Sequence, residues 1–163
     1  FRAEQYFARD SFNLAINGDG NYLGFLDIIE EYGITESANL AHYYAGISYL
    51  HLGEYDNAIE NLNEFKVDGK IIEPQKLGAL GNAYLEKDNR DRALDYFHDA
   101  IDADDNSFTA PLYMSKAAIV YELKGEYQEA IDLYEEIKRR YPESAQNEDA
   151  DKNIARLKVL ANK

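Results

Sequence analysis

The chain of 163 residues contains no cysteine, which excludes disulfide bridges, thiolate metal ligands and a cysteine nucleophile. Basic residues are also few: 17 Lys and Arg face 31 Asp and Glu, for a formal net charge of −14. This deficit argues against binding to nucleic acid or to anionic lipid, because both require a positive protein surface. No run of about 18 apolar residues occurs, so no segment is expected to span a membrane. The length is that of one domain, large enough to bury a core without cross-links.

Proline is scarce as well, and its three positions divide the chain into units of similar length. Pro74 lies 37 residues before Pro111, and Pro142 follows 31 residues later. When the chain is laid on itself at offsets of 35 and 37 residues, three segments match. Small residues, tyrosines and large apolar residues recur in them at fixed positions: Gly46, Gly81 and Ala118; Tyr49, Tyr84 and Tyr121; Ala58, Ala93 and Ala130; and Leu62, Phe97 and Tyr134.

These recurring positions resemble the tetratricopeptide repeat (TPR), a helix–turn–helix unit of about 34 residues. The resemblance implies an all-α fold, a right-handed TPR superhelix of antiparallel helix pairs with a C-terminal capping helix. A single TPR domain is then expected over residues 1–163. It comprises a degenerate repeat at 1–34, repeats at 39–72, 74–107 and 111–143, and a capping helix at 144–163.

The apolar spacing and the turn residues predict where the individual helices lie. Small residues that recur on both helices of each unit should let two helix backbones approach closely. No strand is expected. The predicted helices cover residues 2–17, 21–32, 37–52, 55–66, 73–87, 90–102, 109–124, 127–140 and 144–161.

Residues that could carry catalysis or bind a metal are few. His42, His51 and His98 include no pair at the i, i+4 spacing of a helical metal site. The acidic stretch 102–107 lacks the glycine and the final glutamate of a calcium-binding loop. No glycine-rich phosphate loop is present. We therefore expect no enzyme activity, no cofactor and no metal.

The family resemblance implies that the first helices of successive repeats line a concave groove. A groove of mixed apolar and polar side chains suits an extended or helical segment of a protein partner. The alternative is self-association, in which terminal helices mediate homodimerisation and the chain's own helices fill the groove. The residues expected in the groove are Leu40, Tyr43, Ile47, Leu50, Gln75, Asn82, Leu85, Leu112, Ser115, Ile119 and Glu122.

Some TPR domains hold the C-terminal carboxylate of chaperones with a clamp of basic residues and asparagine. Asn82 and Lys116 match two positions of that clamp. The other lysines and the arginine of the clamp have no counterpart, so binding of chaperone tails is not expected.

Two segments resemble a narrower bacterial group within the family. Residues 21–32 and 39–46 are similar to TPR proteins tethered to the inner membrane by one N-terminal helix, such as the ancillary subunit of the secretion translocon. Residues 141–144 are similar to the same group and to envelope-assembly lipoproteins. The resemblance implies a scaffold in secretion or envelope assembly, at the extracytoplasmic face of the inner membrane. The cytoplasm is the alternative location. Contact with the membrane is expected only through an anchor before residue 1, which is Phe and not Met.

Overall fold

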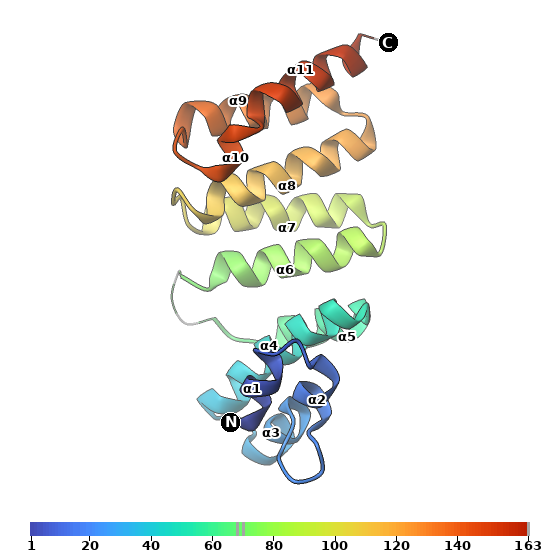
Figure 1. The fold of residues 1–163 in the computed structure, drawn as a ribbon, viewed down its shortest axis with the longest axis vertical. Helices are drawn as coiled ribbons and strands as arrows, with labels where there is room; N and C mark the ends of the chain where they lie inside the picture. Colours follow the sequence, from blue (N-terminus) through green and yellow to red (C-terminus); the bar gives the residue numbers. More distant parts are fainter. Residues whose placement is uncertain (68, 70, 163) are drawn as a thin grey trace. The chain divides into compact units, whose positions relative to one another are not determined.

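The computed structural model describes residues 1–67, 69 and 71–162. Asp68 and Lys70, in the predicted repeat 39–72, and Lys163, in the predicted capping helix, lie outside the described residues. No described residue belongs to a strand, and the predicted all-α fold is confirmed. The helices are α1 (Arg2–Phe7), α2 (Phe12–Asn17), α3 (Phe25–Tyr32), α4 (Glu36–Leu52), α5 (Tyr55–Glu64), α6 (Glu73–Glu86), α7 (Arg90–Ala103), α8 (Thr109–Lys124), α9 (Tyr127–Arg140), α10 (Ala145–Glu148) and α11 (Ala150–Ala161) (Figure 1).

The chain divides into two compact units, Phe1–Asp68 and Gly69–Lys163. In the N-terminal unit, α4 packs against α2, α3 and α5. Its core forms because small residues on α4 leave room for large rings from α1 and α3. This cluster contains Ala3, Ala15, Phe25, Ile28, Ala41 and Ala45, with Tyr6, Phe7 and Tyr44 packed against it.

The single helix predicted over residues 2–17 is wrong, because the chain forms α1 and α2 with a break between them. Asp10, in the turn between the two helices, adopts a left-handed conformation with φ of 56°, so the chain changes direction there. In a continuous helix Phe7 and Phe12 would point about 140° apart, since successive residues are about 100° apart around the axis. The break instead lets the two rings pack edge to face, with their centroids 5.8 Å apart.

The second predicted helix begins four residues later than expected, at Phe25 rather than at residue 21. The preceding loop is fixed by Asp19, whose carboxylate accepts hydrogen bonds from the backbone N–H groups of Asn21 and Tyr22 at 2.9 and 2.8 Å. The Tyr6 hydroxyl donates a third at 2.5 Å and is the main reason why the pKa of Asp19 is lowered. A Cβ on Gly18 would lie 2.4 Å from the Tyr22 carbonyl oxygen, so the turn requires glycine there.

The C-terminal unit consists of the antiparallel pairs α6–α7 and α8–α9, followed by α11 on α9 (Figure 1). Helices α6, α8 and α11 follow one another as the first helices of successive repeats. One hydrophobic cluster joins α7 to α8, a second joins α8, α9 and α11, and the two share partly buried side chains. The larger cluster includes Met114, Ala118, Ile131, Tyr134, Ile137, Ile154 and Leu157.

The predicted close approach of helices at small residues is confirmed. A Cβ on Gly46 would lie 2.7 Å from Cγ of Leu62, and one on Gly81 would lie 2.6 Å from Cε1 of Phe97. Both distances are too short for real side-chain contacts, so each glycine sits where a facing side chain fills the space. Leu62 and Phe97 are themselves recurring positions of the sequence pattern, four residues after Ala58 and Ala93.

The predicted helix 144–161 is interrupted at Asp149, which separates α10 from α11. The inward face of α11 buries Ile154 and Leu157 against the α8–α9 pair. Lys152 and Lys158 on its other face are exposed. A helix with one apolar and one charged face can end a stack of repeats without leaving apolar surface in water.

Candidate interaction face on helices α6, α8 and α11

The candidate site centres on α8, which has well-defined ends. The Asn106 carboxamide oxygen accepts hydrogen bonds from the backbone N–H groups of Phe108 and Thr109 at the start of the helix, both at 2.7 Å. Gly125 ends the helix in the left-handed conformation that favours glycine. Residues on α8 are therefore presented on a rigid element between α6 and α11.

Lys116 on α8 is a half-buried cation whose contacts are with neutral groups. Its Nζ donates a hydrogen bond to Oδ1 of Asn82 on α6 at 3.0 Å. The same Nζ lies 6.0 Å from the centroid of the Phe97 ring. Within the described part of the chain, no carboxylate forms an ion pair with Lys116. Burial lowers the pKa of this lysine, since a charged amine loses hydration there.

Gln75 adds an unsatisfied acceptor to the same helix as Asn82. Its Oε1 is buried and has no hydrogen-bond partner among the described residues. The two side chains are seven residues apart on α6, which puts them on one face of the helix two turns apart. A buried carbonyl oxygen without a donor is costly for the fold.

Two large apolar side chains of α8 stand in solvent beside Lys116. Ile119 is 46% exposed and Leu123 is 51% exposed. They are four residues apart and therefore neighbours on the helix surface. Together with Lys116 they form a short patch of one cation and two aliphatic groups, which we call the α8 patch.

Glu122 is not free for a partner, because Arg156 on α11 binds it through both carboxylate oxygens. Arg156 Nη2 donates to Oε2 at 2.8 Å, and Nη1 donates to Oε1. The hydrogen bond from Arg156 lowers the pKa of Glu122, and the carboxylate raises the pKa of Arg156. The pair joins α8 to α11 at the edge of the α8 patch.

The remaining predicted groove residues of this unit lie deeper. Leu85 and Leu112 are half-buried and pack against the cluster around Phe97. Ser115 is half-buried and forms a hydrogen bond with the hydroxyl of Tyr134, which opposes the rise that burial causes in the pKa of Tyr134. These three side chains support the face more than they offer contact surface.

In the N-terminal unit, the predicted groove residues lie on α4. Tyr43 is half-buried, its ring 5.2 Å from that of Phe65, and burial raises its pKa. Ile47 and Leu50 are half-buried as well. Leu40 is exposed and lines a small pocket of about 50 Å³ with Phe25 and Tyr44, among others.

Sequence reasoning missed Arg156, which lies in the predicted capping helix 144–163 and was given no role. It also noted Lys116 as a clamp position without including it in the groove. A signal was present for both. Asn82 and Lys116 are 34 residues apart, and so are Glu122 and Arg156. Each of these polar residues on a first helix therefore contacts a residue one repeat length later in the chain, on the first helix of the next repeat.

No arrangement that could hold a metal was found in the described part of the chain. Each histidine has a structural contact instead. His42 Nδ1 lies 3.2 Å from Oδ1 of Asn61, and His98 Nε2 lies 2.9 Å from the Tyr121 hydroxyl. The His51 ring stacks on Phe12. Among residues 1–67, 69 and 71–162, none of the helices combines the length and hydrophobicity needed to cross a membrane.

Comparison with solved structures reveals the same fold elsewhere. A crystal structure of MamA matches with a TM-score of 0.75 at 21% identity, covering 98% of this chain and 86% of that one. A second MamA structure matches with a TM-score of 0.73 at 20% identity, covering 98% and 80%. A putative kinesin light chain of Podosopora anserina with nearly identical TPR-like repeats matches with a TM-score of 0.74 at 15% identity, covering 98% and 83%. No curated protein sequence matches significantly.

Family models match two segments of the chain. Residues 79–145 match one model of the tetratricopeptide repeat, and residues 40–67 match another. Together these segments make up more than half of the sequence. Proteins built from such repeats are generally scaffolds without catalytic activity that bind protein partners. The chain belongs to the tetratricopeptide-repeat family.

Proposed function

We propose that this protein is a non-enzymatic scaffold that holds a segment of a protein partner on the face formed by α6, α8 and α11. The observation that carries the proposal is Lys116, a half-buried cation with no carboxylate partner in the described residues. It lies in a chain that has 31 acidic residues available to neutralise it. Leaving a cation only partly hydrated is unfavourable unless another molecule supplies the opposite charge.

The side chains around Lys116 define what the partner segment offers. A carboxylate is expected at Lys116, because a hydrogen bond that Nζ donates to a charged oxygen is stronger than the present one that it donates to the neutral oxygen of Asn82. Apolar side chains are expected on Ile119 and Leu123, whose exposed area costs free energy in water.

The test is site-specific photocrosslinking from α8. Benzoylphenylalanine replaces Ile119, and adducts are collected from a lysate of the organism that makes the protein and identified by mass spectrometry. We expect one adduct that disappears when Lys116→Met is added, since the substitution keeps length and removes charge. The matched control carries the probe at Leu14, an exposed leucine on α2 of the N-terminal unit. An adduct that survives Lys116→Met, or forms equally from position 14, would refute the proposal.

The narrower part of the proposal is a role in bacterial secretion or envelope assembly, at the extracytoplasmic face of the inner membrane. It is supported by the similarity of residues 21–32 and 39–46 to membrane-tethered bacterial TPR proteins. The full-length gene product should then sediment with inner membranes and become accessible to protease in spheroplasts. Recovery in the cytoplasmic fraction would favour the alternative location.

Homodimerisation stays a prediction and concerns a surface other than the inward face of α11, which is already buried against α8 and α9. Light scattering over a hundredfold range of concentration measures it directly. A constant monomer mass would eliminate self-association, and a mass that doubles would favour it.

A further inference from the structure

The turn between α7 and α8 presents one aromatic side chain to solvent. Phe108 is 84% exposed. Every other aromatic residue of the C-terminal unit is buried or half-buried. A ring exposed to this extent covers almost nothing of its own chain, so it contributes little to the fold and leaves apolar surface in water.

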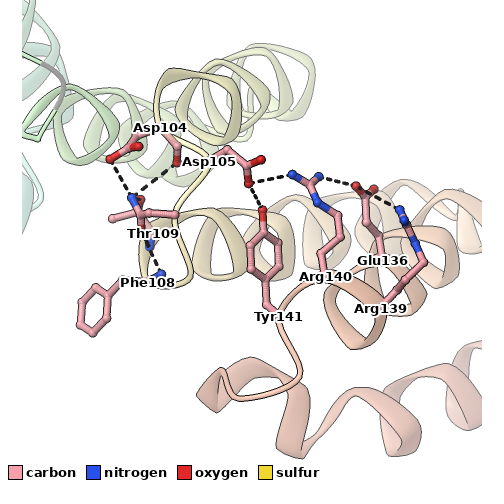
Figure 2. A network of polar contacts seen from close by, with 9 residues as sticks. Asp104, Asp105, Phe108, Thr109, Glu136, Arg139, Arg140 and Tyr141 are labelled. Atoms are coloured by element: carbon pink, nitrogen blue, oxygen red, sulfur yellow. Dashed lines mark hydrogen bonds and ion pairs between the residues drawn. The ribbon is translucent and has the colours of Figure 1, made fainter.

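The backbone of this turn is held by a polar network that does not involve the ring (Figure 2). Besides accepting from the backbone N–H groups of Phe108 and Thr109, Asn106 donates from Nδ2 to the Asp104 carboxylate at 2.9 Å. The same Nδ2 donates to the Thr109 hydroxyl at 2.7 Å. Figure 2 shows the Phe108 ring directed away from these contacts.

A second set of contacts ties the turn to the end of α9. Arg140 Nη2 lies 2.7 Å from Oδ1 of Asp105, and the Tyr141 hydroxyl donates to the same carboxylate. Arg140 also binds Glu136 at 2.5 Å. Phe108 is therefore carried by a turn fixed on both sides, and a ring held in this way loses little conformational entropy when it is covered.

Two unpaired carboxylates precede the ring in the chain, on the last turns of α7, and five residues connect that end of α7 to the start of α8. Asp99 and Asp102 on the last turns of α7 are exposed, and no described residue forms a hydrogen bond or ion pair with them. Negative charge at the C-terminal end of a helix is unfavourable, because the helix dipole is negative there. No lysine or arginine occurs between Arg92 and Lys116, and Arg140, which reaches the turn from α9, pairs with Asp105 and Glu136 instead. This arrangement of negative charge does not stabilise the fold, but it would favour the binding of a positively charged partner.

We propose that Phe108, Asp99 and Asp102 form a second docking surface, which takes a basic segment of a protein partner. An apolar side chain of that segment covers the Phe108 ring, and flanking lysine or arginine side chains pair with Asp99 and Asp102. The surface is distinct from the α8 patch, since Phe108 precedes Lys116 by about 12 Å along the helix axis.

A second apolar residue supports this placement. Ile71, in the turn before α6, is also 84% exposed and precedes Phe108 by 37 residues. The helices α6 and α8 both begin at the same edge of the C-terminal unit (Figure 1). The edge thus offers apolar side chains from two successive turns, as a partner segment lying along it requires.

The experiment pans a phage library of random 12-residue peptides against the whole chain, with depletion on the Phe108→Ser variant. Because Phe108 is exposed, the variant should keep the circular dichroism spectrum and melting temperature of the wild type. We expect peptides that combine an aliphatic or aromatic residue with net positive charge. Their affinity should fall about 10- to 100-fold in Phe108→Ser, as burial of a large apolar side chain implies.

Two further variants separate this surface from its surroundings. Asp99→Asn with Asp102→Asn should weaken binding of the selected peptides and flatten its dependence on salt. Leu123→Ser, which removes an exposed leucine from the α8 patch, should leave their affinity within about twofold. Failure to find peptides that discriminate against Phe108→Ser would overturn the proposal, as would discriminating peptides without net positive charge. A comparable loss in Leu123→Ser would also overturn it, because it would place the peptides on the α8 patch.

Discussion

Substituting Gly81 by alanine tests the packing of α6 against α7 with a single methyl group. That methyl carbon would lie 2.6 Å from Cε1, 2.7 Å from Cδ1 and 3.1 Å from Cζ of Phe97. Phe97 is 0% exposed and belongs to a closed cluster, so its ring cannot move away without displacing other core side chains. Overpacking of this kind costs about 1–3 kcal/mol.

An opposing contribution comes from helix propensity. Glycine inside a helix is about 1 kcal/mol less favourable than alanine, so the substitution regains that amount. The net expectation is a free energy of unfolding lowered by up to about 2 kcal/mol. Because the two contributions have opposite signs, the sign of the measured change decides which of them is larger.

The assay is urea unfolding followed by circular dichroism, on Gly81→Ala, Phe97→Leu and the double variant. Phe97→Leu removes the ring atoms that the new methyl group would meet. The double variant should therefore lose less stability than the sum of the single ones, with a coupling of about 0.5–3 kcal/mol. A Gly81→Ala protein more stable than the wild type, with additive effects in the double variant, would refute the close approach of these helices.

Three further outcomes follow from the polar contacts of the C-terminal unit. Because burial lowers the pKa of Lys116, the folded chain releases this proton at lower pH than the unfolded chain. The free energy of unfolding of the wild type, relative to that of Lys116→Met, should therefore rise as the pH increases toward 10.5. Urea unfolding of both proteins at several pH values measures this difference. A difference that falls with increasing pH would contradict the prediction. Arg156→Ala should raise the pKa of Glu122 toward 4.5, as measured by NMR titration of the carboxyl carbon, and an unchanged value would show that the pair does not persist in solution. Asn106→Ala should lower stability by about 1 kcal/mol, because the backbone N–H groups of Phe108 and Thr109 at the start of α8 lose their acceptor. It should also speed amide hydrogen exchange at Phe108 and Thr109, and exchange rates equal to those of the wild type would mean that the turn is held by other contacts.

Repeated features of the fold were predictable because they obey a spacing rule. Gly46 and Gly81 recur with the side chains that face them, Leu62 and Phe97, since each repeat solves the same packing problem with the same residues. The break at Asp10 and the late start of α3 were not predictable in this way. They depend on contacts specific to the first repeat, the packing of Phe7 on Phe12 and the hydrogen bonds of Asp19. A helical pattern of apolar residues cannot show where two rings on the same predicted helix must meet.

The candidate site illustrates the same limit at the level of side chains. Family positions correctly indicated that Asn82, Ile119 and Glu122 lie on first helices, but not which of them remain available to a partner. Availability depends on the neighbouring helix: Arg156 neutralises Glu122, whereas no carboxylate of the described chain reaches Lys116. Both relationships join residues one repeat apart, so they become visible only when the helices are stacked. In a chain with such an excess of acid, a half-buried lysine without a carboxylate partner departs from what composition alone would produce, and it therefore indicates the charge that a partner supplies at this position.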